Sequence, residues 1–239
     1  MVSIIIPTLN EEDYLPLLLE SIKKQDFKDY QVIVADAGSK DTTREIAKSY
    51  GCNVVEGGLP SKGRNNGAKV ASGDLLFFLD ADTVLPRDFL KKTLREFNDR
   101  KIDIASFCFD SYSKNKFFHL MLDFYNNVII ALGKKLPYSA IGILVKNQLF
   151  ETLNGYNEDL KLSEDHDLAR RAVHYGKFGT IRSSHILVSD RRFKQDGWFQ
   201  TTIKYFLSEL HVAFIGPVTS DIFNYKFNHY KDEKIENRK

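Results

Sequence analysis

The chain is poor in cysteine, tryptophan and proline, and it contains no long apolar run. Only two of its 239 residues are cysteines, Cys52 and Cys108, and they lie far apart in the sequence. This spacing argues against a disulfide framework or a zinc site, and isolated thiols suit a reducing cytosol. No window approaches the roughly 18 uninterrupted apolar residues of a membrane-spanning helix. A predicted strand follows Met1 directly, so we expect no signal peptide and a cytoplasmic protein.

Neither sign of charge dominates the chain. There are 34 lysines and arginines against 32 aspartates and glutamates, a formal net charge of +2. This balance argues against a broad nucleic-acid-binding surface, so we expect no nucleic-acid partner. Apolar residues at 43% and charged residues at 28% are typical of an ordinary soluble protein. The length suffices for one large domain with a substantial core, and neither an internal repeat nor a low-complexity linker interrupts it.

Short apolar runs alternate with helical patterns in the first third of the chain. The predicted strands cover residues 2–6, 31–35, 53–55 and 75–79. A predicted helix separates each strand from the next, and Pro16 places the start of the first helix close to Asp13. This alternation predicts an α/β fold with a Rossmann-like, doubly wound, mainly parallel sheet and helices on both faces. In such sheets ligands bind at the carboxyl ends of the strands.

The pattern is looser in the remainder of the chain. Strands are predicted at residues 102–109 and 138–145, and helices at residues 86–97, 117–132, 147–153 and 164–176. Aromatic residues dominate the carboxyl-terminal segment. We therefore divide the chain into a domain of residues 1–194 and a helical aromatic extension of residues 195–239. Two interpretations of the extension remain open: it packs on the core or forms a homodimer contact, or it lies peripherally on a cytoplasmic membrane surface.

Two carboxylates follow the predicted strand at residues 75–79. Because side chains alternate along a strand, Asp80 and Asp82 can point the same way. Adjacent carboxylates repel each other, and hard oxygen ligands favour Mg²⁺ or Mn²⁺ between them. The alternative is that one aspartate caps the next helix while the other is only solvated. The pair by itself does not decide between these readings.

Five motifs, in the same order, resemble those of family-2 glycosyltransferases with the GT-A fold. They are Ser3-Ile4-Ile5-Ile6-Pro7-Thr8-Leu9-Asn10-Glu11-Glu12, Val34-Ala35-Asp36-Ala37-Gly38-Ser39-Lys40-Asp41-Thr42, Gly63-Arg64-Asn65-Asn66-Gly67-Ala68, Leu79-Asp80-Ala81-Asp82 and Ser163-Glu164-Asp165-His166-Asp167-Leu168-Ala169-Arg170-Arg171. The resemblance covers roughly residues 2–190. It implies a metal-dependent, inverting transfer of a sugar from a UDP- or GDP-sugar. The acceptor would be a glycan or a polyprenyl or dolichyl phosphate, as in cell-envelope or glycolipid synthesis.

The resemblance places the nucleoside of the donor at the first two motifs. It implies that Asp36 meets the nucleobase, and a carboxylate can accept a hydrogen bond from a base N–H. Glu11 would lie beside the ribose, together with backbone groups of Pro7 and Thr8. Without a ligand, Glu11 would instead stabilise the dipole of the following helix.

The diphosphate would lie near Gly63 and Arg64, which we expect in a loop. Glycine lets a backbone approach phosphate, and arginine supplies a forked donor. The alternative is a solvated turn, which suits the neighbouring Lys62. Arg191 and Arg192 form a second basic pair that would clamp the diphosphate or a phosphorylated acceptor.

The resemblance also assigns the metal ligands. Asp82 would coordinate the cation directly, and Asp80 would contact the ribose or a metal-bound water. His185 would be a further ligand, although a lone histidine is also an ordinary strand-end residue. The cation would stabilise charge on the departing nucleoside diphosphate.

The acceptor would be activated by the acidic pair at residues 164–165. By resemblance, Asp165 is the general base, with Glu164 beside it. A carboxylate in the first turn of a helix is otherwise only a dipole partner. Residue types alone do not exclude a retaining outcome.

Two other functions compete with this interpretation. A sugar nucleotidyltransferase would carry a glycine-rich basic loop after the first strand, which residues 7–11 do not provide. A catalytically silent carbohydrate- or partner-binding domain would not need Asp80, Asp82 and Asp165. The Gln-x-x-Arg-Trp motif of processive synthases of the family is also absent, because Trp198 follows Asp196-Gly197. We therefore expect a single transfer.

Overall fold

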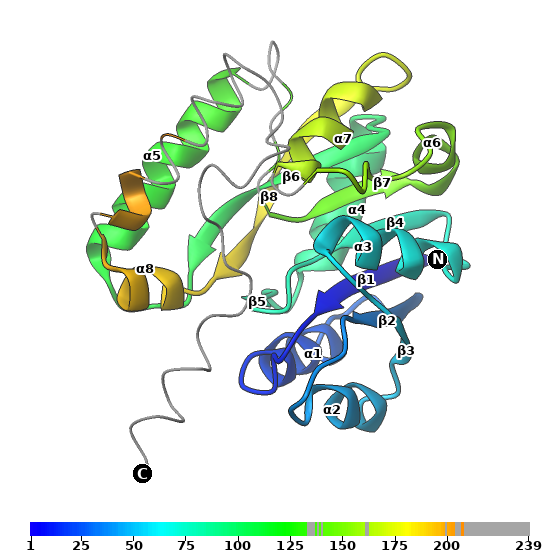
Figure 1. The fold of residues 1–239 in the computed structure, drawn as a ribbon. Helices are drawn as coiled ribbons and strands as arrows, with labels where there is room; N and C mark the ends of the chain where they lie inside the picture. Colours follow the sequence, from blue (N-terminus) through cyan, green and yellow to red (C-terminus); the bar gives the residue numbers. More distant parts are fainter. Residues whose placement is uncertain are drawn as a thin grey trace.

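The computed structural model describes residues 1–132, 137, 139, 141–160, 163–198, 200–203 and 207. Within this part of the chain an eight-stranded sheet has the order β3-β2-β1-β4-β7-β6-β8-β5 (Figure 1). Its strands are β1 (Val2–Thr8), β2 (Tyr30–Asp36), β3 (Asn53–Glu56), β4 (Leu75–Phe78), β5 (Thr83–Val84), β6 (Ile104–Ser111), β7 (Ile143–Lys146) and β8 (Phe178–Val188). The helices are α1 (Leu15–Lys23), α2 (Thr43–Ser49), α3 (Pro60–Lys69), α4 (Phe89–Asp99), α5 (Lys116–Leu132), α6 (Asn147–Thr152), α7 (Glu164–Ala172) and α8 (Arg191–Asp196).

The amino-terminal half of the sheet is parallel, as predicted. β1 pairs in parallel with both β2 and β4, and β2 pairs in parallel with β3. Ile4, Ile5 and Ile6 in β1 are fully buried, because helices cover both faces of this strand. The carboxyl ends of β1, β2 and β4 therefore meet at one edge, where the loops that carry the predicted donor residues come together.

The other half of the sheet is mixed. β7 runs antiparallel to β4 and β6, whereas β8 runs parallel to β6 and antiparallel to β5. The sequence pattern did not predict β5 or β8. β5 has only two residues, and β8 includes the exposed polar residues Arg182 and Ser183 in its middle.

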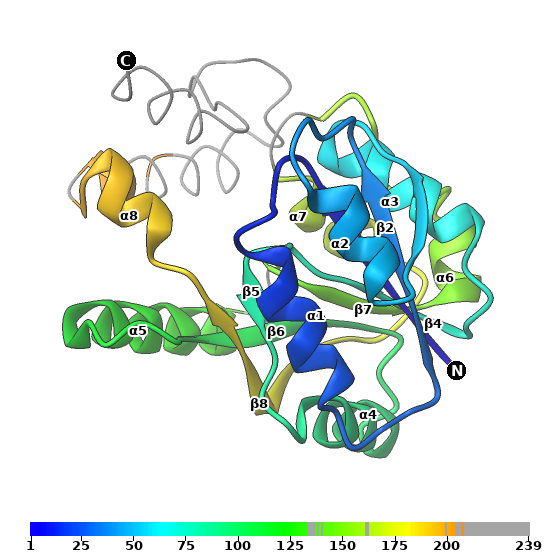
Figure 2. The ribbon, with the colours of Figure 1, turned by 90° about the horizontal axis from the view of Figure 1, so that it is seen from below.

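Helices cover both faces of the sheet. Ile4 and Phe77 pack in one apolar cluster with side chains of α1, α2, α4 and α5. Ile5 and Phe78 pack in a second cluster with side chains of α3, α6 and α7. Because neighbouring residues of a strand point to opposite faces, the two clusters are the two sides of one sheet (Figures 1 and 2). This confirms the predicted doubly wound arrangement of the central strands.

The region around the predicted domain boundary is continuous with the core. α5 and α8 lie at the same end of the molecule in both views (Figures 1 and 2). A boundary after residue 194 would fall inside α8. Trp198 packs against Phe118 and Phe193, with ring centroids 5.5 and 5.0 Å away, so the beginning of the predicted extension belongs to the core.

Most of residues 199–239 lies outside the described residues. The predicted helical extension, homodimer contact and membrane-surface contact therefore remain predictions. Within the part of the chain that the structure describes, no helix is both long and apolar enough to cross a membrane.

Candidate active site

A buried arginine joins the predicted donor and acceptor residues. Arg64, only 4% exposed, donates from Nη1 to Glu164 Oε1 at 2.5 Å and from Nη2 to Asp80 Oδ1 at 2.8 Å. Its Nη2 also lies 3.9 Å from Asp165 Oδ2. Burial lowers the pKa of Arg64, but the surrounding carboxylates outweigh burial and raise that pKa well above its ordinary value. Arg64 therefore holds the carboxyl end of β4 and the start of α7 around one positive charge.

The position of Arg64 depends on a helix rather than on the predicted loop. The expectation of a loop through residue 64 is wrong, because α3 begins at Pro60, a residue that suits the first turn of a helix. Gly63 faces the sheet, where a Cβ would lie 3.4 Å from the Cβ of Pro7. A side chain there would make only ordinary contact, so Gly63 marks the face of α3 that lies on β1. A contact of Gly63 with phosphate stays a prediction.

Asp165, the predicted general base, is buried at the start of α7 and only 6% exposed. Tyr156 donates a hydrogen bond from its hydroxyl group to Asp165 Oδ1 at 2.9 Å. Burial raises the pKa of Asp165 to about 7; Arg64 opposes this rise, whereas Glu164 and Asp80 add to it. A carboxyl group with this pKa can take up a proton near neutral pH. Nothing in the sequence spacing marks Tyr156 as a site residue.

The segment that carries Tyr156 is held in place by side-chain hydrogen bonds. The side chain of Asn65 accepts from Tyr156 N and donates to Tyr156 O, both at 2.9 Å. Arg171 donates to the carbonyl oxygens of Leu153 and Gly155 at 2.7 and 2.8 Å. These contacts fix residues 153–156 and, through the hydroxyl of Tyr156, the carboxylate of Asp165.

A second arginine bridges the other predicted acids. Arg191 donates from Nη1 and Nη2 to the two carboxylate oxygens of Glu11, both at 2.9 Å. Its Nε lies 3.1 Å from Asp82 Oδ2, and its guanidinium carbon lies 4.3 Å from the ring centroid of Tyr14. Burial raises the pKa of Glu11, Arg191 opposes the rise, and Asp82 and Asp80 add to it. Glu11, Asp82 and Arg191, predicted for ribose, metal and diphosphate respectively, thus form one compact cluster.

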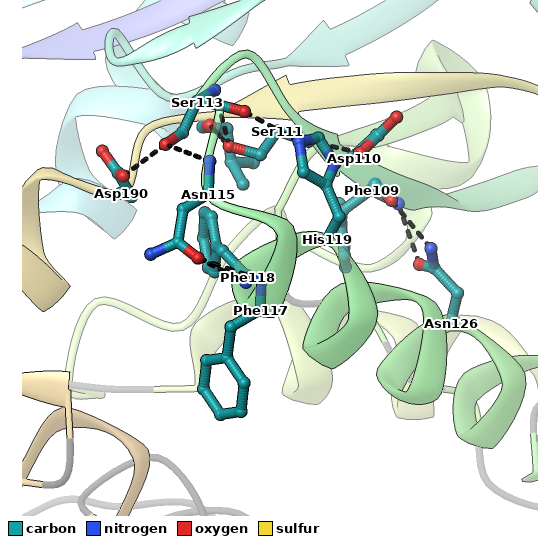
Figure 3. A network of polar contacts seen from close by, with 11 residues as sticks. Phe109, Asp110, Ser111, Ser113, Asn115, Phe117, Phe118, His119, Asn126 and Asp190 are labelled. Carbon is teal, nitrogen blue, oxygen red and sulfur yellow. Dashed lines mark hydrogen bonds and ion pairs between the residues drawn. The ribbon is translucent and has the colours of Figure 1, made fainter.

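A polar network fixes the residue before Arg191 (Figure 3). Ser113 Oγ donates to Asp190 Oδ2 at 2.5 Å, and Lys194 Nζ lies 2.8 Å from Asp190 Oδ1. His119 contacts Asp110 Oδ1 through Nδ1 at 2.6 Å and the carbonyl oxygen of Ser113 through Nε2 at 2.7 Å. The loop between β6 and α5 is therefore tied both to α5 and to the start of α8.

The predicted nucleobase residue, Asp36, is 1% exposed and bonded on both carboxylate oxygens. Oδ1 accepts from the backbone N–H groups of Gly38 and Ser39 at 3.2 and 3.0 Å, and Oδ2 accepts from Thr8 Oγ1 at 3.2 Å. Arg44 Nη1 lies 3.3 Å from Oδ1. Asp36 thereby orders the loop after β2. This loop borders a cleft of about 450 Å³ lined by Asp36, Ala37, Gly38, Arg44, Glu56, Gly57, Gly58 and Lys62.

The predicted metal carboxylates lie on a turn directly after β4. Thr83 donates to the carbonyl oxygen of Asp80 from its N and its Oγ1, at 3.3 and 2.8 Å, so the turn rather than strand alternation presents Asp80 and Asp82. Desolvation raises the pKa of Asp80, Arg64 lowers it, and Asp82 raises it further. The two neighbouring carboxylates repel each other, and a hard divalent cation bound to their oxygens would reduce this repulsion. Among the described side chains, no three His, Cys, Asp or Glu residues form a ready-made metal cluster.

The structure does not bring His185 to these carboxylates. His185 lies in the interior of β8 and pairs with Cys108 of β6. Thr83, next to Asp82, pairs with Val188, three positions further along the strand and hence about 10 Å away. The side chain of Arg192, the other residue of the predicted clamp, lies outside the described part of the structure.

Two curated glycosyltransferases are similar to part of this chain. TarS of Staphylococcus aureus, named a poly(ribitol-phosphate) β-N-acetylglucosaminyltransferase, is 32% identical over 112 residues, which are 43% of this chain and 20% of TarS. A Campylobacter jejuni enzyme, named GalNAc(5)-diNAcBac-PP-undecaprenol β-1,3-glucosyltransferase, is 31% identical over 115 residues, or 44% of this chain and 37% of that protein. The chain thus spans well under half the length of these relatives.

Solved structures show the same fold. The mannosyltransferase PcManGT from Pyrobaculum calidifontis, in complex with GDP-Man and Mn²⁺, has a TM-score of 0.72 and 21% identity. The similarity covers 89% of this chain and 63% of that one. TarS 1–349 with UDP-GlcNAc has a TM-score of 0.64 and 21% identity, and covers 89% of this chain and 73% of its own.

The family itself follows from a sequence match that extends from β1 through α6. Residues 3–152, which include β1 to β4 and the turn with Asp80 and Asp82, match the description Glycosyl transferase family 2. This match covers more than half of the chain and agrees with the GT-A fold of the solved relatives. The chain therefore belongs to glycosyl transferase family 2.

Proposed function

We propose that the chain is a metal-dependent, inverting glycosyltransferase that moves a sugar from a UDP- or GDP-sugar to an acceptor hydroxyl or lipid phosphate. The observation that carries the proposal is the bridge through Arg64. It places Asp80, predicted at the donor, and Asp165, predicted at the acceptor, within reach of one guanidinium group. A transferase needs such a junction, because the acceptor must reach the sugar carbon that the diphosphate leaves.

The nucleoside would enter the cleft beside Asp36. Its base would meet the loop after β2, and its ribose would lie toward Glu11 and the carboxyl end of β1. The diphosphate would then approach Arg191, whose forked donors suit phosphate oxygens as well as carboxylates. Asp80 and Asp82 would hold Mg²⁺ or Mn²⁺, which would stabilise negative charge on the leaving diphosphate.

Asp165 would take the proton of the acceptor hydroxyl. The acceptor oxygen forms the new bond to the anomeric carbon while the bond from that carbon to the diphosphate oxygen breaks, and the nucleoside diphosphate leaves with the electron pair. Tyr156 and Arg64 hold the carboxylate in place for this step. Attack opposite the leaving group inverts the configuration, as the sequence resemblance implies.

For the acceptor we propose a chemical class rather than one molecule. The names of the relatives include a polymer of ribitol phosphate and a lipid-diphosphate-linked glycan. For this chain, we propose a glycan or a polyprenyl or dolichyl phosphate. The latter would fit peripheral contact with a membrane.

Asp165→Asn tests the proposed role of the base. The asparagine keeps the size of the side chain and its hydrogen bond with Tyr156 but cannot take up the proton, so we expect transfer to fall by about 10²–10⁴-fold while nucleotide affinity is retained. NMR of the product with a matched donor and acceptor would give its anomeric configuration. An active Asp165→Asn enzyme would remove Asp165 as the base, and retention of configuration would rule out the inverting mechanism.

A further inference from the structure

Three carboxylates share one small region at the carboxyl edge of the sheet. Burial raises the pKa of Glu11 and Arg191 opposes the rise, while the charges of Asp82 and Asp80 add to it, so the three carboxylates repel one another. In the described structure Arg191 supplies positive charge to two of them, Glu11 and Asp82. Its side chain is 16% exposed, and this partial burial strengthens the attraction.

Arg191 engages these partners through all three of its guanidinium nitrogens. Two of them bind Glu11 as a fork, and Nε faces Asp82 Oδ2 at 3.1 Å. The ring of Tyr14 lies against the face of the guanidinium group. Asp82 Oδ2 therefore has a positively charged partner before any ligand arrives.

A cation and Arg191 would use the same oxygen. A divalent ion needs the carboxylate oxygens of Asp82 as ligands, and it would repel a guanidinium group held 3.1 Å from one of them. Phosphate oxygens present the same forked acceptor geometry as a carboxylate. A nucleoside diphosphate could thus draw Arg191 away from the acids.

We propose that Arg191 competes with the divalent cation for Asp82, and that a nucleoside diphosphate relieves the competition by accepting the guanidinium group in place of Glu11 and Asp82. This inference rests on the proposed function. In this role Arg191 is a positioning residue that couples cation binding to donor binding. Cation and nucleotide each bind more tightly when the other is present.

Calorimetric titrations of the full chain with Mn²⁺ alone, with UDP or GDP alone, and with Mn²⁺ in the presence of saturating nucleotide test this role. Arg191→Met removes the charge but keeps an apolar chain over Tyr14. We expect the variant to bind Mn²⁺ alone more tightly and the nucleotide more weakly than the wild type, each by about fivefold or more. The gain in affinity that Mn²⁺ and nucleotide give each other should therefore be smaller in Arg191→Met than in the wild type. Arg191→Lys, which keeps the charge without the fork, gives intermediate values.

Tighter Mn²⁺ binding together with weaker nucleotide binding distinguishes this role of Arg191 from a purely structural one. Loss of affinity for both ligands, or unchanged Mn²⁺ affinity in Arg191→Met, would overturn the proposal. Arg95→Met, at an exposed arginine of α4 that pairs with Asp99, is the matched control and should change neither affinity. Thermal unfolding of each variant identifies folding defects, and if Arg191→Met does not fold, the sign of the Mn²⁺ effect in Arg191→Lys decides.

The proposed function can fail separately. If the wild type binds neither UDP nor GDP with Mn²⁺ present, the donor assignment fails. The comparison of Mn²⁺ binding between the wild type and Arg191→Met still reports the competition. Absence of Mn²⁺ binding in both, with or without nucleotide, would overturn the competition as well.

Discussion

Asp165 lies between two groups that favour its ionised form, the hydroxyl of Tyr156 and the guanidinium of Arg64, in surroundings that disfavour charge. The balance sets its pKa to about 7. Removing the Tyr156 hydroxyl removes one of these two favourable contacts. The carboxylate that is proposed to take the proton of the acceptor remains. The pH dependence of the reaction should therefore respond to this residue.

In Tyr156→Phe, we expect the pKa of Asp165 to rise. The acidic limb of kcat/KM then moves to higher pH, because a larger fraction of the base is protonated at each pH below its pKa. A hydrogen bond to a charged group contributes about 1.5–3 kcal/mol, so the loss at about pH 6 should be roughly tenfold greater than at about pH 9. Steady-state rates across this range measure the shift.

Tyr175→Phe is the control, because Tyr175 lies just after α7 and is 68% exposed. Its profile should match the wild type. An unmoved acidic limb in Tyr156→Phe would mean that Asp165 is not the group whose titration limits the reaction.

The acids of the site could be identified from the sequence, but their partners could not. Asp80, Asp82 and Asp165 lie in motifs that resemble a known family. The guanidinium of Arg64, however, contacts an acid 100 positions away, and that of Arg191 contacts one 180 positions away. Local spacing carries no information on such pairings, and Tyr156 lies in no pattern that distinguishes it from a core tyrosine.

At the scale of elements, the close approach of α3 to β1 positions Arg64. A Cβ at Gly67 would lie 2.4 Å from Cγ2 of Ile5, well inside normal contact distance. We expect Gly67→Ala to lower the free energy of unfolding by about 1–3 kcal/mol through overpacking, despite the better helix propensity of alanine. Chemical denaturation measures this change.

A second substitution tests whether overpacking against Ile5 causes the loss of stability in Gly67→Ala. Leucine lacks the β-branch methyl of isoleucine, so Ile5→Leu should recover part of the loss when it is combined with Gly67→Ala. The packing account would be wrong if Gly67→Ala were as stable as the wild type, or if the double variant showed no recovery.

α5 is attached to the neighbouring loop through His119 (Figure 3). The contact with Asp110 and then the carbonyl of Ser113 raise the pKa of His119 above its ordinary value of 6.5, and Asp123 adds to the rise. A raised folded-state pKa gives stability that is complete below the unfolded value of about 6.5 and is lost as pH rises through the folded value. We therefore expect His119→Ala to lower the Tm more at about pH 6 than at about pH 9.

His174→Ala, at an exposed histidine just after α7, should show no such difference between the two pH values. Thermal unfolding of both variants and the wild type in the same buffers gives the comparison. An equal loss of Tm in His119→Ala at both pH values would show that the protonated imidazole does not stabilise this loop.

The predictability of the elements follows from their burial. β1, β2 and β4 are buried on both faces and read as apolar runs, so their positions could be predicted within one or two residues. β8 carries exposed Arg182 and Ser183, and its pairing with β6 shifts register between Phe107 and Cys108. Neither alternation nor an apolar run marks such a strand, so β8 could not be predicted, although β6 and β7 of the same half were expected as strands.

In the whole molecule, the candidate site joins parts of the chain that are independent in sequence. The family match ends at residue 152, before Asp165 and Arg191. α7 and α8 bring these residues back to the edge formed by β1, β2 and β4, where Arg64 and Arg191 connect them to Asp80 and Glu11. The proposed function requires a donor site and an acceptor-activating group on one edge, and the residues proposed for both roles lie there.

The most direct measurement is a calorimetric titration of UDP and GDP, with and without Mn²⁺, into the wild type and Asp82→Ala. The account predicts that one nucleotide binds the wild type more tightly with Mn²⁺, and that Asp82→Ala loses this gain, whereas Asp99→Ala, at an exposed aspartate of α4, keeps it. If neither nucleotide binds under any condition, or if Asp82→Ala binds as the wild type does with Mn²⁺, the edge with Asp80 and Asp82 is not a metal-dependent donor site.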